Sequence, residues 1–140
     1  MDIASHMTLL VRGKLKVMGE SWVSLGFAGG VEDSPYSYGR GDGTGCYYKV
    51  SYGNHVHISF NCSFNYTGSE FTINSTPIPE SYRPNQTVCS LCPVNDRHIA
   101  LVSVQTDGYI RVEWVQSLKD TVDTGSVSIL WIDGYLDYWV

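Results

Sequence analysis

One β-hairpin with an Asp-Gly turn constrains the fold of this chain more than any other stretch. Residues 99–106 and 109–115 are both rich in β-branched side chains, and they flank the dipeptide Asp107-Gly108. Such a dipeptide is typical of a tight type I′ turn, in which both central residues need positive φ. The sequence therefore predicts an antiparallel pair of strands here, to which the other strands are added.

A proline-rich segment precedes this hairpin. Residues 77–84 read Pro-Ile-Pro-Glu-Ser-Tyr-Arg-Pro, and three prolines in eight residues remove too many backbone donors for a central strand. We expect a rigid extended crossing in which Pro79 and Pro84 fix the backbone. Tyr82 is expected to pack, and Arg83 to pair with a carboxylate or with carbonyl groups. These residues, together with Asp107 and Gly108, form the expected structural motif.

Alternation of apolar and polar side chains predicts the remaining strands. It is clearest at residues 55–64, where five apolar side chains from Val56 to Phe64 would share the core face. His55 and His57 fall on the polar face, where histidine is more typical of a solvated strand than of a metal site. Further strands are predicted near residues 14–17 and at 21–27, 46–52, 71–73, 87–94, 126–132 and 135–140, with Gly53-Asn54 and Asp133-Gly134 as turns.

No stretch shows a sustained helical period. About eight to ten short strands separated by Gly, Asn and Asp turns predict an all-β fold, an antiparallel β-sandwich resembling a jelly roll. Two runs, residues 99–104 and 129–132, are apolar on both faces. Because one face of a two-layer sheet is normally in contact with water, we expect a second copy of the chain to cover them. The alternative is that loops of the same chain cover these strands.

The 140 residues are enough for one domain with a hydrophobic core. Residues 1–7 end in Ser-His-Met, which is typical of a cloning site, and we interpret them as a vector-derived tag. Residues 8–19 are expected to be the end of a stalk or connector, or a first strand. Residues 20–140 are expected to form the β-sandwich domain.

Charge and composition exclude several classes of partner. The formal net charge is −5, and the basic residues cluster only at the alternating positions Arg12, Lys14 and Lys16. Nucleic-acid binding requires a basic surface, so no nucleic-acid partner is expected. No apolar run is long enough to span a membrane, and no membrane insertion is expected. The low charged fraction of 16% implies a surface rich in Ser, Thr, Asn and Tyr, which suits extracellular and virion proteins.

The four cysteines are Cys46, Cys62, Cys89 and Cys92, and the last two form a CxxC motif. A structural zinc ion needs four ligands, usually from two such pairs, whereas the other two cysteines are isolated. We therefore expect buried free thiols and neither a metal nor a cofactor. One or two disulfides remain an alternative that the spacing does not settle.

The motifs of common enzymes are absent. The sequence contains no G-x-S-x-G, no H-E-x-x-H and no P-loop, so we expect a non-catalytic protein. It does contain four N-glycosylation acceptor patterns, at Asn61, Asn65, Asn74 and Asn85. These patterns favour an alternative, a secreted N-glycosylated and disulfide-containing β-sandwich domain of a eukaryotic surface protein.

The proline-rich element followed by strand, Asp107-Gly108 and strand resembles a module of phage and prophage tail-fibre tips. The upstream order is also similar: a Trp22 strand, a glycine-rich loop, and residues 47–50 paired with residues 56–64. The resemblance spans roughly residues 20–132 and departs from the pattern in the four cysteines and in Ser81, where glycine is usual. In general design such heads are also similar to adenovirus fibre knobs. The resemblance implies the homotrimeric head of a viral attachment fibre, at the fibre tip of the virion, that binds a host-cell surface receptor, often a glycan, without catalysis.

Candidate receptor contacts come from loop chemistry. Sugars are bound by aromatic faces together with a few fixed polar groups, and the glycine-rich loop at residues 28–45 offers Tyr36, Tyr38, Arg40 and Asp42. Arg40 could bind an acidic sugar, and residues 40–42 also form an integrin-type Arg-Gly-Asp. Tyr138 and Trp139 are second candidates, with closure of the core as the alternative role for both.

Overall fold

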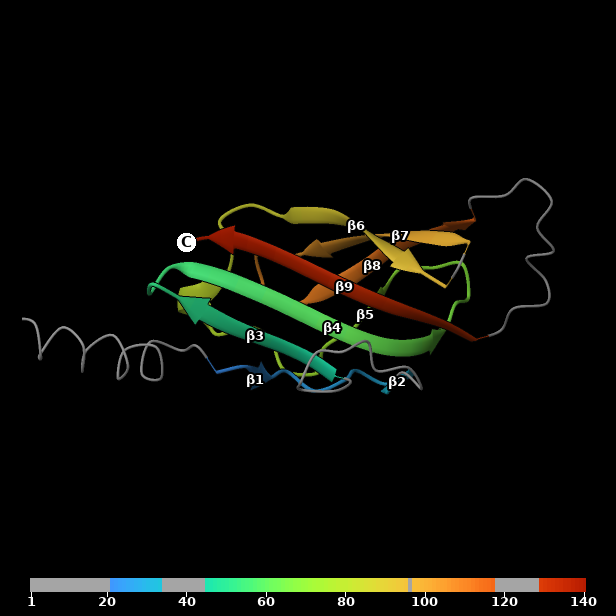
Figure 1. The fold of residues 1–140 in the computed structure, drawn as a ribbon, viewed down its shortest axis with the longest axis horizontal. Helices are drawn as coiled ribbons and strands as arrows, with labels where there is room; N and C mark the ends of the chain where they lie inside the picture. The colour runs from blue at the N-terminus through green and yellow to red at the C-terminus, as the bar shows by residue number, and fades with distance from the viewer. Residues whose placement is uncertain (1–20, 34–44, 96, 118–128) are drawn as a thin grey trace, which may run out of the picture.

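The structure is a computed structural model that describes residues 21–33, 45–95, 97–117 and 129–140. Within these residues the chain forms one nine-stranded sheet whose strand pairs are all antiparallel (Figure 1). The strands are β1 (Val23–Ser24), β2 (Val31–Asp33), β3 (Gly45–Ser51), β4 (His55–Asn65), β5 (Phe71–Thr72), β6 (Val88–Val94), β7 (His98–Val104), β8 (Ile110–Ser117) and β9 (Ile129–Trp139). The one helical element in the described residues is the 3₁₀ turn η1 (Glu80–Tyr82). The all-β prediction is confirmed.

The sheet curls into two layers around the core. Its strand order is β1-β3-β4-β9-β6-β7-β8-β5, with β2 added to β4, and Figure 1 shows β3, β4 and β9 side by side with β6, β7 and β8 behind them. The pairing of Val94 with Ile132 joins the layers, and beside it Asn95 N donates to Trp131 O at 3.2 Å. The two ends of the strand order also meet, because Thr76 N donates to Leu25 O at 3.0 Å. The sandwich prediction is confirmed, with both layers belonging to one continuous sheet.

The core lies between the layers and is built by the inward side chains of the long strands. Val56, Ile58 and Phe60 of β4 are fully buried and belong to the same core cluster as Val102 and Val112 of the other layer. Burial of each large side chain stabilises the fold by roughly 1.5–3 kcal/mol. The predicted inward face of residues 55–64 is therefore observed.

The outward face of β4 differs from the prediction in its second half. Ser59, Asn61 and Ser63 are buried as well, although they alternate with the core residues. The reason is that β4 is a central strand, and in the ladder Ser59 lies between Tyr47 of β3 and Tyr135 of β9. Large neighbouring side chains therefore account for the burial of Ser59, whereas Asn61 lies between Gly45 of β3 and Asp133 of β9 and has no such cover in the ladder.

The predicted turn at Asp133-Gly134 is wrong, because β9 passes through it without a break. Gly134 is paired with Phe60 of β4, and a Cβ at residue 134 would lie only 2.1 Å from the Phe60 ring. Glycine is therefore needed here for close packing against an aromatic ring rather than for a turn.

The turn between β3 and β4 is shifted by one residue from the prediction. Its central residues are Tyr52 and Gly53, with φ of 57° and 79°, and Asn54 N donates to Ser51 O at 3.3 Å. Positive φ at both positions is the requirement of a type I′ turn rather than of the predicted type II′ turn.

The β7–β8 hairpin is confirmed, but its turn type is not. Of the dipeptide, only Gly108 has positive φ, at 86°. Gly108 N donates to Gln105 O at 3.0 Å and Gln105 N donates to Tyr109 O at 2.9 Å, which describes a type I turn followed by a glycine bulge. The Asp107 carboxylate accepts a hydrogen bond from Tyr109 N at 3.0 Å and orders the turn.

The proline-rich crossing docks on this hairpin turn. Ile78 N donates to Gly108 O at 3.0 Å, and Arg83 Nε donates to Ile78 O at 2.7 Å. Tyr82 is half-buried, and its carbonyl accepts a hydrogen bond from the Tyr138 hydroxyl at 2.6 Å. The residues of the expected structural motif thus lie together, and Arg83 pairs with a carbonyl group rather than a carboxylate.

Two predictions near the start of the described chain need correction. The loop expected at residues 28–45 contains a strand, β2, which pairs with β4. The strand expected at residues 21–27 is regular only at β1, where Val23 is 47% exposed, whereas Leu25 is buried. Gly26 has a φ of 65°, and this left-handed residue ends the alternation. The strand expected near residues 14–17 lies outside the described residues.

Candidate functional site

The outward side of β3, β4 and β9 carries a cluster of polar and aromatic side chains. The ladder places Ser51, His55 and Trp139 in one row, and His57 and Asp137 in the next. We call this cluster the outer histidine face. It consists of Ser51, His55, His57, Tyr135, Asp137 and Trp139.

His55 holds two other members of the outer histidine face in place. Its Nε2 donates to Asp137 Oδ2 at 2.7 Å, since a carboxylate can only accept. Its ring stacks on the Trp139 indole with centroids 4.1 Å apart and an interplanar angle of 7°. Trp139 nevertheless remains 62% exposed, so a large aromatic surface is presented to solvent in a fixed orientation.

His57 connects two hydroxyl groups. Its Nε2 lies 3.1 Å from Ser51 Oγ, and its Nδ1 is hydrogen-bonded to the Tyr135 hydroxyl. A neutral imidazole has one donor and one acceptor, so one of the two hydroxyls donates and the other accepts. Burial, and then the nearby Asp137 carboxylate, raise the pKa of Tyr135, which keeps its phenol protonated at neutral pH.

The pair of Ser51 and His57 has the residue types of a nucleophile and its base, but the arrangement does not favour catalysis. A base of this kind is usually oriented by a carboxylate, whereas the second partner of His57 is a phenol and Asp137 is bonded to His55. Ser51 is also buried.

The structure separates the two predicted contact residues at the end of β9. Tyr138 is buried and its hydroxyl donates to Tyr82 O at 2.6 Å, and burial raises its pKa. It belongs to the core, which was the alternative role, and offers no exposed surface for a ligand. Trp139 lies on the opposite side of the same strand and is exposed. Tyr36, Tyr38, Arg40 and Asp42 lie outside the described residues.

Sequence reasoning placed His55 and His57 on the outward face but did not include them in a site. It also missed Tyr135 and Asp137, which alternate with Trp139 along β9. The alternation was visible in the sequence. Their convergence depends on the pairing of β4 with β9, which no local pattern reveals.

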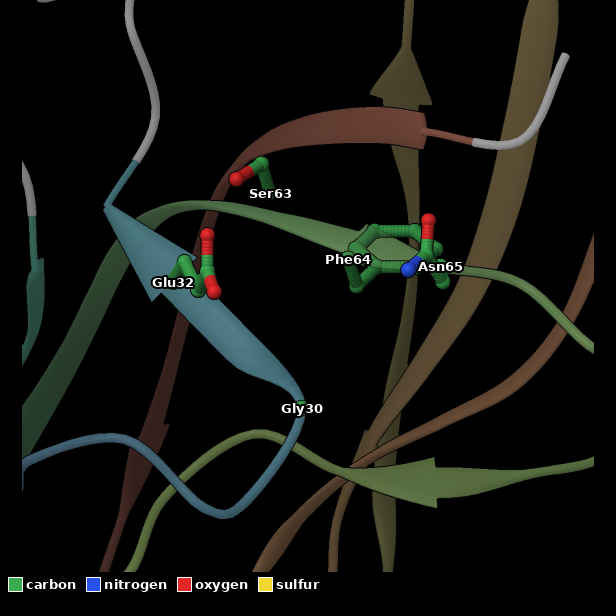
Figure 2. A pocket seen from close by; sticks show the side chains of 5 residues that line it. All are labelled: Gly30, Glu32, Ser63, Phe64 and Asn65. Carbon is green, nitrogen blue, oxygen red and sulfur yellow. The ribbon is translucent and has the colours of Figure 1, made fainter.

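A shallow pocket lies beside β2 and the last residues of β4. Its volume is about 120 Å³, and it is lined by Gly30, Glu32, Ser63, Phe64 and Asn65. Figure 2 shows the Glu32 carboxylate on β2 facing the end of β4. Small-molecule sites usually enclose roughly 300–1,000 Å³, so this pocket is too small for a sugar or a cofactor.

All four cysteines are free thiols, and three of them are buried, as expected. Burial raises the pKa of Cys46 to about 12 and that of Cys92 to about 11, and it also raises the pKa of Cys62. Thiols with such pKa values are unreactive at neutral pH because the thiolate is the nucleophile. Cys89 is exposed. The described residues contain no group of three or more His, Cys, Asp or Glu placed to bind a metal ion.

The four glycosylation patterns differ in accessibility. Asn61 and Asn74 are buried, whereas Asn65 and Asn85 are exposed. The Asn74 amide is part of the fold, since its Nδ2 donates to Thr76 O at 2.9 Å and its Oδ1 accepts from Ile110 N at 2.8 Å. A glycan on Asn74 would require these bonds to break.

No family model and no curated protein matches the chain. The part of the chain that the structure describes has no helix long and apolar enough to cross a membrane.

Proposed function

We propose that this domain is the head of a trimeric viral attachment fibre, and that it binds a host-cell surface glycan without catalysis. The observation that carries the binding role is the exposed Trp139 stacked on His55 beside the Asp137 carboxylate. Sugar rings need an apolar surface for their CH groups and fixed polar partners for their hydroxyls. The resemblance of residues 77–84 and of the following hairpin to tail-fibre tips supports a place at the tip of the virion fibre.

A second surface supports assembly into a trimer. On the outward side of β6, β7 and β8, Leu91, Leu101 and Trp114 are paired in one row across the three strands. Leu91 is 56% exposed and Trp114 is 36% exposed. Exposed apolar rows of this kind mark interaction sites. A copy of the same chain would cover them and would leave the outer histidine face, on the other layer, free for the receptor.

Attachment is tested with the full chain, fluorescently labelled, on candidate host cells and on a printed glycan array. We expect saturable binding to cells that falls after the surface glycans have been removed enzymatically. The same glycans, incubated with the protein and analysed by mass spectrometry, should be recovered intact. Absence of binding to any cell or glycan would contradict the attachment function, and cleavage of a glycan would contradict its non-catalytic character.

The exposure of Asn65 and Asn85 favours the alternative, a secreted glycoprotein domain. Expression in a secretory eukaryotic host separates the two. The alternative predicts a mass increase that an N-glycosidase removes, together with disulfides in non-reduced protein. The free thiols of the structure point the other way.

A further inference from the structure

We propose that the outer histidine face binds a neutral pyranose, which stacks on Trp139 and donates hydroxyl hydrogen bonds to Asp137. This inference rests on the proposed attachment function and specifies its site and its ligand class. It places the site on strands β4 and β9 rather than on the glycine-rich loop.

The stacking surface is built before any ligand arrives. Trp139 is paired with His55 in the β4–β9 ladder, its ring lies on the His55 imidazole, and that imidazole is fixed by Asp137 at 2.7 Å. One face of the indole is therefore supported, while the side chain stays 62% exposed. A ligand that meets a preordered aromatic ring loses less free energy in ordering the protein, and the CH face of a pyranose matches such a ring.

The polar partner lies next to the stacking surface. Same-face positions on a strand are about 7 Å apart, so Asp137 is within reach of a sugar seated on Trp139. The Asp137 side chain is 46% exposed, and its Oδ2 is bonded to His55. Its Oδ1 has no hydrogen-bond partner within the described residues, and a carboxylate oxygen accepts from neighbouring sugar hydroxyls in charge-assisted hydrogen bonds.

Charge selects a neutral sugar over an acidic one. The group that would meet the ligand is a carboxylate, and the whole chain carries a net charge of −5. Lys49 shares the row of His57 and Asp137, but its Nζ lies 4.8 Å from the centre of the Trp22 ring, next to β1. A sialic acid at Trp139 would therefore be repelled by Asp137. This differs from the acidic ligand that Arg40 suggested.

The test compares the full chain with four variants on an array of neutral glycans ending in galactose, glucose, mannose or N-acetylglucosamine, printed beside their sialylated counterparts. We expect binding to at least one neutral glycan and weaker binding to its sialylated form. Trp139→Ala and Asp137→Asn should each reduce that binding by at least about tenfold, since each removes one of the two recognition elements. Trp139→Phe should retain part of it.

Glu80→Gln is the matched control for Asp137→Asn, because it neutralises an exposed carboxylate on η1; its binding should equal that of the unchanged chain. Thermal unfolding of every variant identifies loss of fold. If the chain binds cells but no glycan, binds only acidic glycans, or binds neutral glycans equally well after Trp139→Ala, this site is overturned while attachment stands. If it binds neither cells nor glycans, the attachment function itself fails.

Discussion

At the scale of single residues, Gly134 and Phe60 form a matched pair. The Phe60 ring occupies the space that a side chain at residue 134 would need, with its nearest carbon 2.1 Å from the position of a Cβ. Gly134→Ala should therefore lower the free energy of unfolding by about 1–3 kcal/mol, because a packed aromatic ring must move. Urea denaturation measures the change.

Gly29→Ala is the control for this substitution, since a Cβ at residue 29 meets nothing within 4 Å. It should change stability by less than about 0.5 kcal/mol. In a Phe60→Leu background the cost of Gly134→Ala should shrink, because the smaller side chain leaves room. If Gly29→Ala and Gly134→Ala destabilise the fold equally, the Phe60 ring is not the reason that residue 134 is a glycine.

Because several thiols are buried, the free energy of unfolding should depend on pH in the alkaline range. In the unfolded chain the Cys46 thiol ionises near its ordinary pKa of 9.0, whereas burial raises its pKa to about 12 in the folded state. The unfolded state therefore loses its proton first, and the contribution of Cys46 to stability is complete below pH 9 and falls as the pH rises toward 12. Cys62, Cys92 and Tyr138 act in the same direction.

Cys46→Ala should flatten the decline of the melting temperature as the pH rises from about 9 toward 12, even if it lowers the melting temperature at pH 7. Cys89→Ala, at the exposed cysteine, should leave the slope unchanged. Differential scanning fluorimetry across the pH series measures both. Identical slopes for the two variants and the unchanged chain would mean that Cys46 is not protected by burial.

At the scale of elements, the docking of the proline-rich crossing on the β7–β8 turn is the central contact. Gly108 has a φ of 86°, and a Cβ there would lie 2.7 Å from Ile78 O and 2.9 Å from Ile78 N. Gly53 has a similar φ of 79° but no atom within 4 Å of its Cβ position. Alanine substitutions at the two glycines therefore separate two free-energy costs. Both include the cost of a left-handed backbone, and only the one at Gly108 adds the cost of disturbing the close contact with Ile78.

Gly53→Ala should destabilise the fold by about 1–2 kcal/mol, the usual cost of a left-handed residue with a Cβ. Gly108→Ala should destabilise the fold by about 1–3 kcal/mol more than Gly53→Ala does, because the proline-rich crossing must also move away from the turn. Chemical denaturation of both variants gives the difference. Equal destabilisation by the two substitutions would mean that the proline-rich crossing does not limit the space at residue 108.

Two identical dipeptides show what the sequence could and could not predict. Asp107-Gly108 turns the chain, whereas Asp133-Gly134 lies inside β9 because Phe60, far away in sequence, needs the space. Strands and their core faces follow from local alternation, so most of them were predictable. The outer histidine face was not, since its contacts join residues about 80 positions apart. Only Trp139 had been identified as a candidate.

At the scale of the whole molecule, the curled sheet gives the domain two outward surfaces of different chemistry. The outer histidine face lies on the layer of β3, β4 and β9, and the row of Leu91, Leu101 and Trp114 lies on the layer of β6, β7 and β8. A trimer that buries the apolar row would present three copies of the other surface together. Weak single sites then become a strong attachment through multivalency.

Leu91→Asp tests this division of roles. Leu91 is 56% exposed, so an aspartate there leaves the core intact, but it would place a charge in the proposed interface, where unpaired charges are costly. Multi-angle light scattering should find a trimer for the unchanged chain and protomers for the variant, while Val23→Asp, at an apolar residue on β1 that is 47% exposed, should remain trimeric. On a glycan surface the apparent affinity of the Leu91→Asp protein should fall by at least about tenfold, because its three sites are no longer linked. Its affinity for the same glycan free in solution should not change, since the variant leaves Trp139 and Asp137 in place.

A protomer in the unchanged protein at micromolar concentration would contradict the trimer. Equal losses of affinity in the surface assay and the solution assay would mean that the apolar row and the outer histidine face are not independent.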